Sequence, residues 1–155
     1  MTAPPHTVSV IVPCRNERRY IEGFCAGVLR QMLPAGWTLQ LVIADGQSDD
    51  GTRELLAAMS AADGRIQWLD NPGRIVSTGL NRALACATGE VIVRMDVHTE
   101  YEPDYIAQCL AALESTGADN VGGPWHAQPD ASAGRRRVCT CICWAAGRTS
   151  RSFAP

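Results

Sequence analysis

The sequence predicts an α/β fold in which a mainly parallel β-sheet is covered by helices on both faces. Two observations carry this prediction. Runs of β-branched and apolar residues alternate along the chain with stretches whose apolar residues recur every three or four positions. The chain also has 155 residues, which is the size of one domain with a sizeable core. Strands that alternate with helices imply βαβ units, and these build parallel sheets.

The first strand is predicted over 7–13, a β-branched run that ends at Pro13. Apolar residues spaced three or four apart then predict a helix over 17–32. Residues 39–45 form a second apolar, strand-forming run. A second helix is predicted over 48–62, because this segment opens with helix-capping residues and continues with good helix formers.

The same alternation continues through the next fifty residues, although its signals are shorter. Pro103 stands where a proline is favoured as the first residue of a helix. The remaining predicted strands are 65–70, 90–96 and 118–124, and the remaining predicted helices are 75–87 and 102–116.

Composition and charge exclude several classes of partner. The chain is 46% hydrophobic and 19% charged with a net charge of -2, as in ordinary soluble proteins. We therefore expect no nucleic acid and no anionic membrane as a general partner. No apolar run approaches the 18 residues of a membrane span, and the N-terminus resembles no secretion signal. Seven scattered cysteines favour a reducing, cytoplasmic setting.

A change of composition near Asp130 divides the chain into 1–130 and an Arg- and Cys-rich tail, 131–155. The first part holds all 16 acidic residues, whereas the tail holds five arginines and no acidic residue. The tail also lacks a sustained helix or strand period. An out-of-frame segment, a natural short form and a deliberate fragment each account for this change. The out-of-frame interpretation predicts that the tail is disordered or poorly packed.

Three polar segments follow predicted strands. They are "PCRNE" (13–17), "ADGQSDDGT" (44–52) and "MDVHTE" (95–100). Parallel pairing brings the carboxyl ends of strands to one edge of the sheet, where ligands of such folds bind. Carboxylates brought together repel each other, so this edge is expected to hold a cation. Oxygen ligands with one imidazole suit Mn²⁺ or Mg²⁺, which in turn suits a nucleotide diphosphate.

These segments resemble the GT-A, family 2 glycosyltransferases. The matching blocks are "VSVIVPCRNE", "LVIADGQSDDGT" and "GEVIVRMDVHTE", and the resemblance covers about 8–125. The sequences "RMDVHT" (94–99) and "VGGP" (121–124) are similar to the succinoglycan-type polysaccharide branch. The resemblance implies a GT-A (Rossmann-like) fold, here truncated to the nucleotide-sugar-binding half over 1–130.

The resemblance also implies roles for individual residues. Asp45 would contact the base, usually uracil. Asp96 would lie near the ribose or the metal, and His98 would ligate the metal where the family more often has a second Asp. Because Asp96 and His98 occupy alternate positions at a strand end, their side chains are expected to point the same way. The implied nucleotide-sugar-binding residues are Pro13, Asn16, Glu17, Asp45 and Asp96.

The implied activity is transfer of a sugar from a nucleotide diphosphate sugar, expected to be a UDP-sugar, to a hydroxyl with inversion. The acceptor would be a saccharide or lipid-linked saccharide in polysaccharide or glycolipid synthesis. The family's general base is a carboxylate in a downstream "ED" motif, and this chain has no acidic residue after Asp130. The acceptor half, and the membrane segments that would place a full-length form at the inner face of the membrane, are therefore expected to be missing.

Alternatives with other chemistry remain at the level of the sequence. An inactive nucleotide-binding fragment would keep the donor site and lack transfer. A Rossmann-type oxidoreductase needs a Gly-rich turn after the first strand, and "VPCRNE" has none. Among single residues, Asp49, Asp50 and Thr52 are expected to cap the second helix, and Arg15 to be a solvated loop residue.

Overall fold

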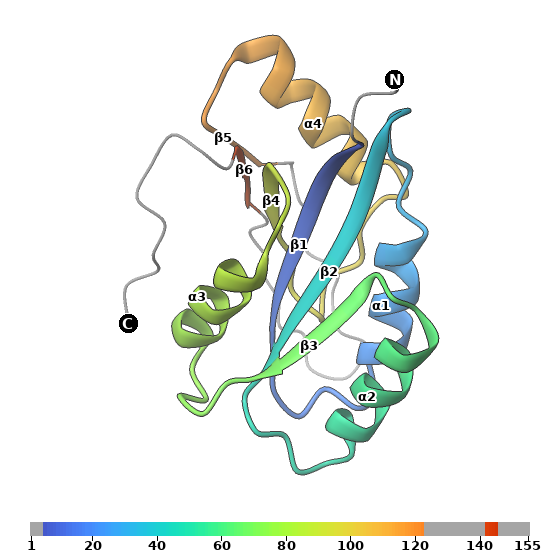
Figure 1. The fold of residues 1–155 in the computed structure, drawn as a ribbon, viewed down its shortest axis with the longest axis vertical. Helices are drawn as coiled ribbons and strands as arrows, with labels where there is room; N and C mark the ends of the chain where they lie inside the picture. The colour runs from blue at the N-terminus through green and yellow to red at the C-terminus, as the bar shows by residue number, and fades with distance from the viewer. Residues whose placement is uncertain (1–4, 123–141, 146–155) are drawn as a thin grey trace, which may run out of the picture.

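The computed structural model describes residues 5–122 and 142–145, with side chains described only in the first range. A six-stranded sheet in the order β3-β2-β1-β4-β6-β5 forms its centre, with helices on both faces (Figure 1). The mainly parallel α/β fold predicted from the sequence is confirmed. The elements are β1 (His6–Cys14), α1 (Ile21–Leu29), β2 (Trp37–Asp45), α2 (Thr52–Ala62), β3 (Ile66–Asp70), α3 (Val76–Cys86), β4 (Val91–Arg94), α4 (Tyr105–Thr116), β5 (Asn120–Val121) and β6 (Ile142–Ala145).

The register of the parallel strands aligns their carboxyl ends. Cys14, the last residue of β1, is paired with Asp45, and Asp45 is paired with Asp70 at the end of β3. On the other side of β1, Ile11 is paired with Arg94, the last residue of β4. The loops that follow these four strands therefore leave the sheet at one edge, which is the lower edge in Figure 1.

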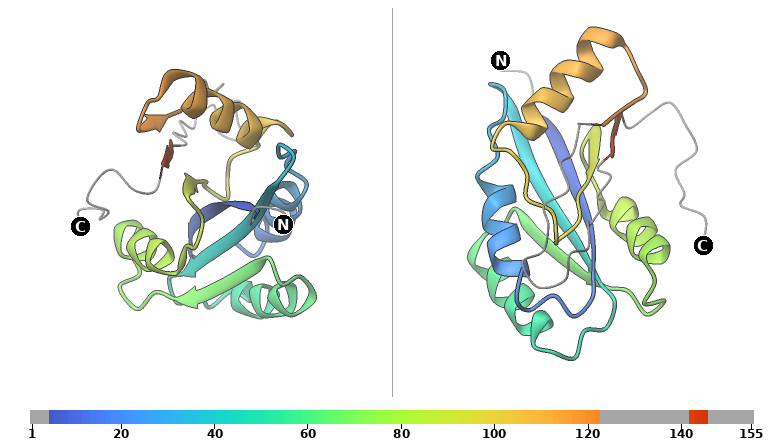
Figure 2. Two further views of the ribbon diagram at one scale, coloured as in Figure 1. Left: turned by 45° about the horizontal axis from the view of Figure 1, so that its top comes forward. Right: turned by 180° about the vertical axis from the view of Figure 1, so that it is seen from behind.

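Alternation along β1 divides the core into two layers. Val8, Val10 and Val12 are buried in one cluster with apolar residues of α1, α2 and α4. Ile11 points to the opposite face and is buried in a second cluster with Leu80 of α3. Figures 1 and 2 show α3 on the side of the sheet away from α1 and α2. Because both faces are covered, the strands consist of almost continuous apolar residues.

Two short strands at one end of the sheet depart from the all-parallel pairing. β6 is antiparallel to β4, and β5 is antiparallel to β6. β6 comes from the tail, 131–155, for which the sequence predicted no element. The other residues of the tail lie outside the described residues, so its predicted disorder stays a prediction. The end of the predicted strand 118–124 lies outside them as well.

The first two helices begin later than the sequence predicted. The predicted helix 17–32 starts only at Ile21, because the residues before it form a turn in which the N–H groups of Tyr20 and Ile21 donate to the Glu17 carbonyl. The predicted helix 48–62 starts at Thr52, after Gly51 with a φ of 94°. In both cases the polar residues before the helix are used to join two loops.

The end of β4 and the start of α4 also differ from the predicted bounds. β4 ends at Arg94 rather than at residue 96. α4 begins at Tyr105, so Pro103 lies before the helix and not at its first position. The Pro103 carbonyl instead accepts a hydrogen bond from the N–H of Met32, at 2.7 Å, which ties the start of α4 to the segment after α1.

Within the part of the chain that the structure describes, no helix has the length and apolar character required to cross a bilayer.

Candidate functional site

A cleft of about 360 Å³ opens at the carboxyl edge of the sheet. It is built by the segments that follow β1, β2, β3 and β4, so residues far apart in the sequence meet there. Its polar wall combines two arginines with two acids and an imidazole. The lining residues are Pro13, Cys14, Arg15, Glu17, Gly46, Asn71, Arg74, Ile75, Val76, Asp96, Val97 and His98.

Glu17 and His98 face each other across this cleft. The Nε2 atom of His98 lies 2.6 Å from Oε1 of Glu17. The imidazole also packs edge-on against Tyr20, with 5.1 Å between the ring centroids. The contact joins the loop after β1 to the loop after β4, and it places an acid beside the predicted metal ligand.

Asp96 and His98 line the cleft together, although not for the reason that the sequence suggested. They lie in a turn, in which the Thr99 N–H donates to the Asp96 carbonyl at 3.1 Å. The expectation that strand alternation orients both side chains was wrong, because β4 ends at Arg94. The Asp96 carboxylate lies 3.4 Å from Nη2 of Arg94. The backbone N–H of Asp96 donates to the Tyr101 hydroxyl at 2.9 Å.

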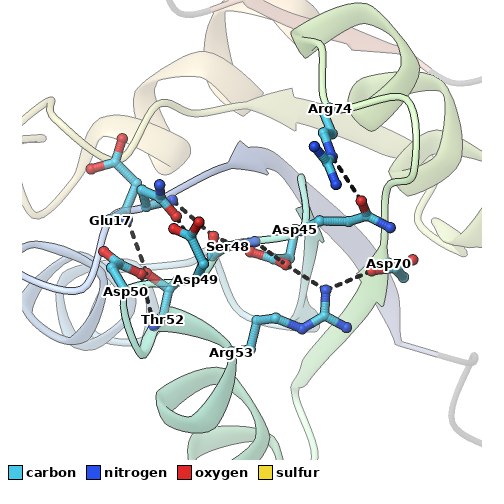
Figure 3. A network of polar contacts seen from close by, with 11 residues as sticks. Glu17, Asp45, Ser48, Asp49, Asp50, Thr52, Arg53, Asp70 and Arg74 are labelled. Atoms are coloured by element: carbon cyan, nitrogen blue, oxygen red, sulfur yellow. Dashed lines mark hydrogen bonds and ion pairs between the residues drawn. The ribbon is translucent and has the colours of Figure 1, made fainter.

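Side chains of the loop after β2 bind the backbone of the loop after β1 (Figure 3). The Asn16 N–H donates to Oγ of Ser48 at 2.8 Å, and the Asp49 N–H donates back to Oδ1 of Asn16 at 3.0 Å. One residue further on, the Glu17 N–H donates to Oγ1 of Thr52 at 2.9 Å. This reciprocal arrangement fixes the backbone that carries Glu17 into the cleft.

Asn16 takes part in that loop contact and is absent from the lining of the cleft. Its φ of 54° places it in the left-handed region, where Asn is tolerated better than most residues. Its amide oxygen accepts the hydrogen bond from the Asp49 N–H. The predicted nucleotide contact by Asn16 stays a prediction.

Asp50 stabilises the start of α2. Its Oδ1 accepts both the N–H and the hydroxyl of Thr52, and its Oδ2 accepts the Arg18 N–H at 3.1 Å. Desolvation opposes ionisation of the exposed Asp50 carboxyl, but the hydrogen bonds from Thr52 and Arg18 outweigh it and lower the pKa of this group. These contacts match the helix-cap interpretation of Asp50.

Asp45 precedes the cleft-lining Gly46 in the chain and is itself buried, with a side chain that is 0% exposed. Its Oδ1 accepts the Ser48 hydroxyl at 2.5 Å, while its Oδ2 accepts the Ser48 N–H at 3.1 Å and Nη1 of Arg53 at 3.0 Å. Asp45 does not line the cleft, but its neighbour Gly46 does. The same Nη1 atom of Arg53 donates to Asp70 at 2.6 Å.

Two arginines of this region had no clear signal in the sequence. Arg74 lines the cleft, has a φ of 57° and donates from Nε to Oε1 of Gln47 at 2.7 Å. Gln47 has a φ of 58°, so both partners adopt a backbone that L-residues rarely take. Arg53 lies in the first turn of α2, and its guanidinium carbon is 5.3 Å from the ring centroid of Trp68. Only the tertiary structure brings either residue beside the predicted site.

The predicted metal ligands Asp96 and His98 both line the cleft but do not belong to a complete coordination sphere. In residues 5–122, no three His, Cys, Asp or Glu side chains gather closely enough to hold a metal ion. A carboxylate and an imidazole nevertheless suit Mn²⁺, and Mg²⁺ is often held by one or two protein ligands together with substrate phosphates. Asp96 and His98 therefore fit a divalent ion that is shared with a bound diphosphate.

Comparison with known proteins agrees with this architecture. The chain is 38% identical over 114 residues to the succinoglycan biosynthesis protein ExoA of Rhizobium meliloti, covering 72% of this chain and 34% of that protein. It is 30% identical to the glycosyltransferase AglD of Haloferax volcanii, covering 88% of this chain and 22% of that protein. This chain thus spans about a third of the first relative and about a fifth of the second.

Solved structures show the same fold. A mannosyltransferase of Pyrobaculum calidifontis, determined with GDP-Man and Mn²⁺, matches with a TM-score of 0.66 and 28% identity, over 77% of this chain and 35% of that one. TarS of S. aureus matches with a TM-score of 0.65 and 20% identity, over 79% and 39%. Residues 9–149 match the model of one family directly. The chain belongs to glycosyl transferase family 2.

Proposed function

We propose that this chain is the donor-binding part of an inverting glycosyltransferase that takes a sugar from a nucleotide diphosphate sugar, a UDP-sugar. The acceptor is the hydroxyl of a saccharide or lipid-linked saccharide, in polysaccharide or glycolipid synthesis on the cytoplasmic side. One observation carries the proposal: Pro13, Glu17, Asp96 and His98, from two segments some eighty residues apart, line a single cleft at the carboxyl edge of the sheet. In open α/β sheets this edge is where ligands bind.

The chemistry of the cleft suits a diphosphate. Arg15 and Arg74 provide permanent positive charge for phosphate oxygens. Asp96 and Glu17 provide acceptors for ribose hydroxyls. Pro13 and Val97 offer apolar surface beside them. We assign Asp45 to the base, Asp96 to the ribose or metal and Asn16 to the nucleoside edge.

In this proposal Asp96 and His98 hold Mn²⁺ or Mg²⁺ only when the diphosphate is present. A bound divalent ion would stabilise the negative charge that grows on the departing diphosphate. His98 is engaged with Glu17 at 2.6 Å, so it must leave that contact to ligate a metal through Nε2. The protein's own part in the reaction is to orient the donor and to keep the diphosphate among cationic groups.

A thermal-shift screen of the 155-residue chain tests the nucleotide and the metal together. UDP, GDP and CDP are each added with and without Mn²⁺, and Mn²⁺ is also added alone. A ligand at one hundred times its dissociation constant stabilises the folded state by about 2.7 kcal/mol, so even weak binding raises the Tm. We expect UDP with Mn²⁺ to give the largest shift, UDP alone a smaller one and Mn²⁺ alone almost none.

The Asp96→Ala variant removes a carboxylate from the cleft. The control is Asp119→Ala, which removes a carboxylate from an exposed residue outside the cleft lining. Asp96→Ala should remove the extra stabilisation that Mn²⁺ gives to UDP, whereas Asp119→Ala should keep it. Failure of every nucleotide diphosphate to stabilise the wild-type chain would refute the donor-binding proposal.

A second candidate is nucleotide binding without transfer. It is favoured by the cleft itself, in which both acids, Glu17 and Asp96, are assigned here to the nucleotide or the metal. A combined assay of donor hydrolysis and sugar transfer separates the two functions. Binding of UDP with no release of sugar would favour the second candidate.

A further inference from the structure

We infer that Arg53 is a positioning residue that sets the base specificity of the site by limiting Asp45 to one free hydrogen-bond acceptor. The inference rests on the proposed function, because it takes Asp45 as the contact to the base. The inference goes beyond the proposed function because it assigns a role to a residue outside the cleft lining. It also gives a physical reason for a preference for uracil over guanine.

The argument begins with the buried carboxylate of Asp45. A carboxylate has about four lone-pair positions that can accept hydrogen bonds. Three of them are used by Oγ of Ser48, the N–H of Ser48 and Nη1 of Arg53. Oδ2 accepts two of these bonds and Oδ1 accepts one. Among the residues that the structure describes, no other donor reaches this carboxylate, so one position remains, on Oδ1.

The number of free acceptors determines which base can be satisfied. Uracil has a single ring N–H between two carbonyl groups, so one acceptor position meets its need. Guanine presents two adjacent donors, the ring N–H and the exocyclic amino group, which a carboxylate binds with both oxygens. With Arg53 on Oδ2, one guanine donor would stay unpaired in a buried setting, and an unpaired buried donor is costly.

Arg53 is held where it can do this by contacts that do not involve the cleft. Its Nη1 also donates to Asp70 at 2.6 Å (Figure 3). Its guanidinium lies over the Trp68 ring. The hydrogen bond from Arg53 lowers the pKa of the Asp70 carboxyl, which keeps that partner ionised. Asp45 is 0% exposed and Arg53 is 34% exposed, so the arginine supplies the charge that the buried acid requires.

In this inference the base reaches Asp45 beside Gly46. Gly46 and Asn71 both line the cleft, and the Asn71 N–H donates to the Asp45 carbonyl at 2.7 Å. Gly46 has no side chain of its own, and the side chain of Arg15 fills the space beside it. Nucleotide binding in this scheme therefore displaces the Arg15 side chain from Gly46, while Arg53 and Ser48 keep Oδ2 occupied.

The test is calorimetric measurement of UDP and GDP affinity, with Mn²⁺ present, for the wild-type chain and for Arg53→Met and Arg53→Lys. An unpaired buried donor corresponds to about a tenfold loss, so the wild-type chain should bind UDP about tenfold more tightly than GDP. Arg53→Met frees a second acceptor and should reduce this ratio at least threefold. Arg53→Lys keeps a charged donor on Oδ2 and should restore the ratio.

Two control variants separate specificity from general stability. Arg65→Met removes an exposed arginine whose Nη2 lies 2.7 Å from Asp63, away from the cleft, and should leave the ratio unchanged. Asp70→Asn removes the charge of the second partner of Arg53 and should lower the Tm without changing the ratio. Both are measured in the same way, with the Tm recorded alongside the affinities.

The outcomes separate this inference from the proposed function. If wild-type chain binds no nucleotide diphosphate, the proposed function fails and the inference fails with it. If it binds UDP but Arg53→Met weakens UDP and GDP by the same factor, the inference alone is refuted, and Arg53 is then a structural residue.

Discussion

His98 occupies the position at which the family resemblance implies a second aspartate, and its surroundings show what that difference changes. Its Nε2 atom is 2.6 Å from Oε1 of Glu17, a contact that two carboxylates could not make without a proton or a cation. An imidazole therefore lets this wall of the cleft close without a metal. We propose that the same imidazole, which adds no negative charge, makes the site prefer Mn²⁺ over Mg²⁺.

Replacement of His98 by Asp tests this role. The His98→Asp variant places two carboxylates face to face, so we expect UDP binding without metal to weaken and the preference for Mn²⁺ over Mg²⁺ to fall. A threefold fall in the affinity ratio, about 0.7 kcal/mol, would be resolved by calorimetry. His98→Asn, which adds no charge, is the control. An unchanged Mn²⁺ to Mg²⁺ ratio in His98→Asp would contradict the assignment of His98 as a ligand.

The residue types at the cleft could be read from the sequence, whereas their contacts could not. Asp96, His98 and Glu17 were identified from polar segments after strands, and all three line the cleft. Asn16 and Asp45 came from the same segments, yet the Asn16 side chain contacts Asp49 and the Asp45 side chain contacts Ser48 and Arg53. The difference depends on side-chain direction within irregular loops, for which no period exists to guide a prediction.

At the scale of elements, the loops after β1 and β2 act as one unit. Thr52 is 0% exposed and joins them, because its hydroxyl accepts the Glu17 N–H and donates to Asp50. This explains why α1 and α2 begin later than their sequences predicted. The capping residues that seemed to start α2 are used partly on the neighbouring loop.

The Thr52→Val variant keeps the shape of the side chain and removes the hydroxyl. The Glu17 N–H then loses its acceptor, and an unsatisfied buried donor costs about 1–3 kcal/mol. We expect the free energy of unfolding in urea to fall by that amount, together with weaker UDP binding because Glu17 is less fixed. Thr52→Ser keeps the hydroxyl and should retain most of both. Equal stability of the Val and Ser variants would show that the hydroxyl is not needed.

At the scale of the whole molecule, buried thiols make stability depend on pH. Burial raises the pKa of the Cys25 thiol to about 12, and burial followed by the charge of Asp45 raises the pKa of Cys14 even further. In the unfolded chain these thiols ionise near 9.0. Their contribution to stability is therefore fully present below pH 9.0 and is lost progressively as the pH rises above it.

Urea denaturation between pH 7 and pH 10 checks this expectation. The free energy of unfolding should decline above pH 9, and the decline should be smaller in Cys25→Ala, although that variant starts from a lower stability because it leaves a cavity. In acid, the free energy of unfolding should fall as the pH decreases. Hydrogen bonds from Arg53 and Arg65 hold the pKa values of Asp70 and Asp63 low, so stability should fall as the pH drops below about 4. A flat profile above pH 9 would show that the thiols are accessible in the folded state.

The sequence by itself determined the order of strands and helices, the two-layered covering of the sheet and the edge at which polar residues gather. These follow from local periodicity and from the geometry of parallel strands, which act over a few residues or by general rule. The tertiary structure alone decided that Arg53 and Ser48 bind the buried Asp45 carboxylate, that Glu17 contacts His98, and that residues of the tail supply β6. These are contacts between distant segments, and their distances depend on the conformations of irregular loops, which no local period in the sequence determines.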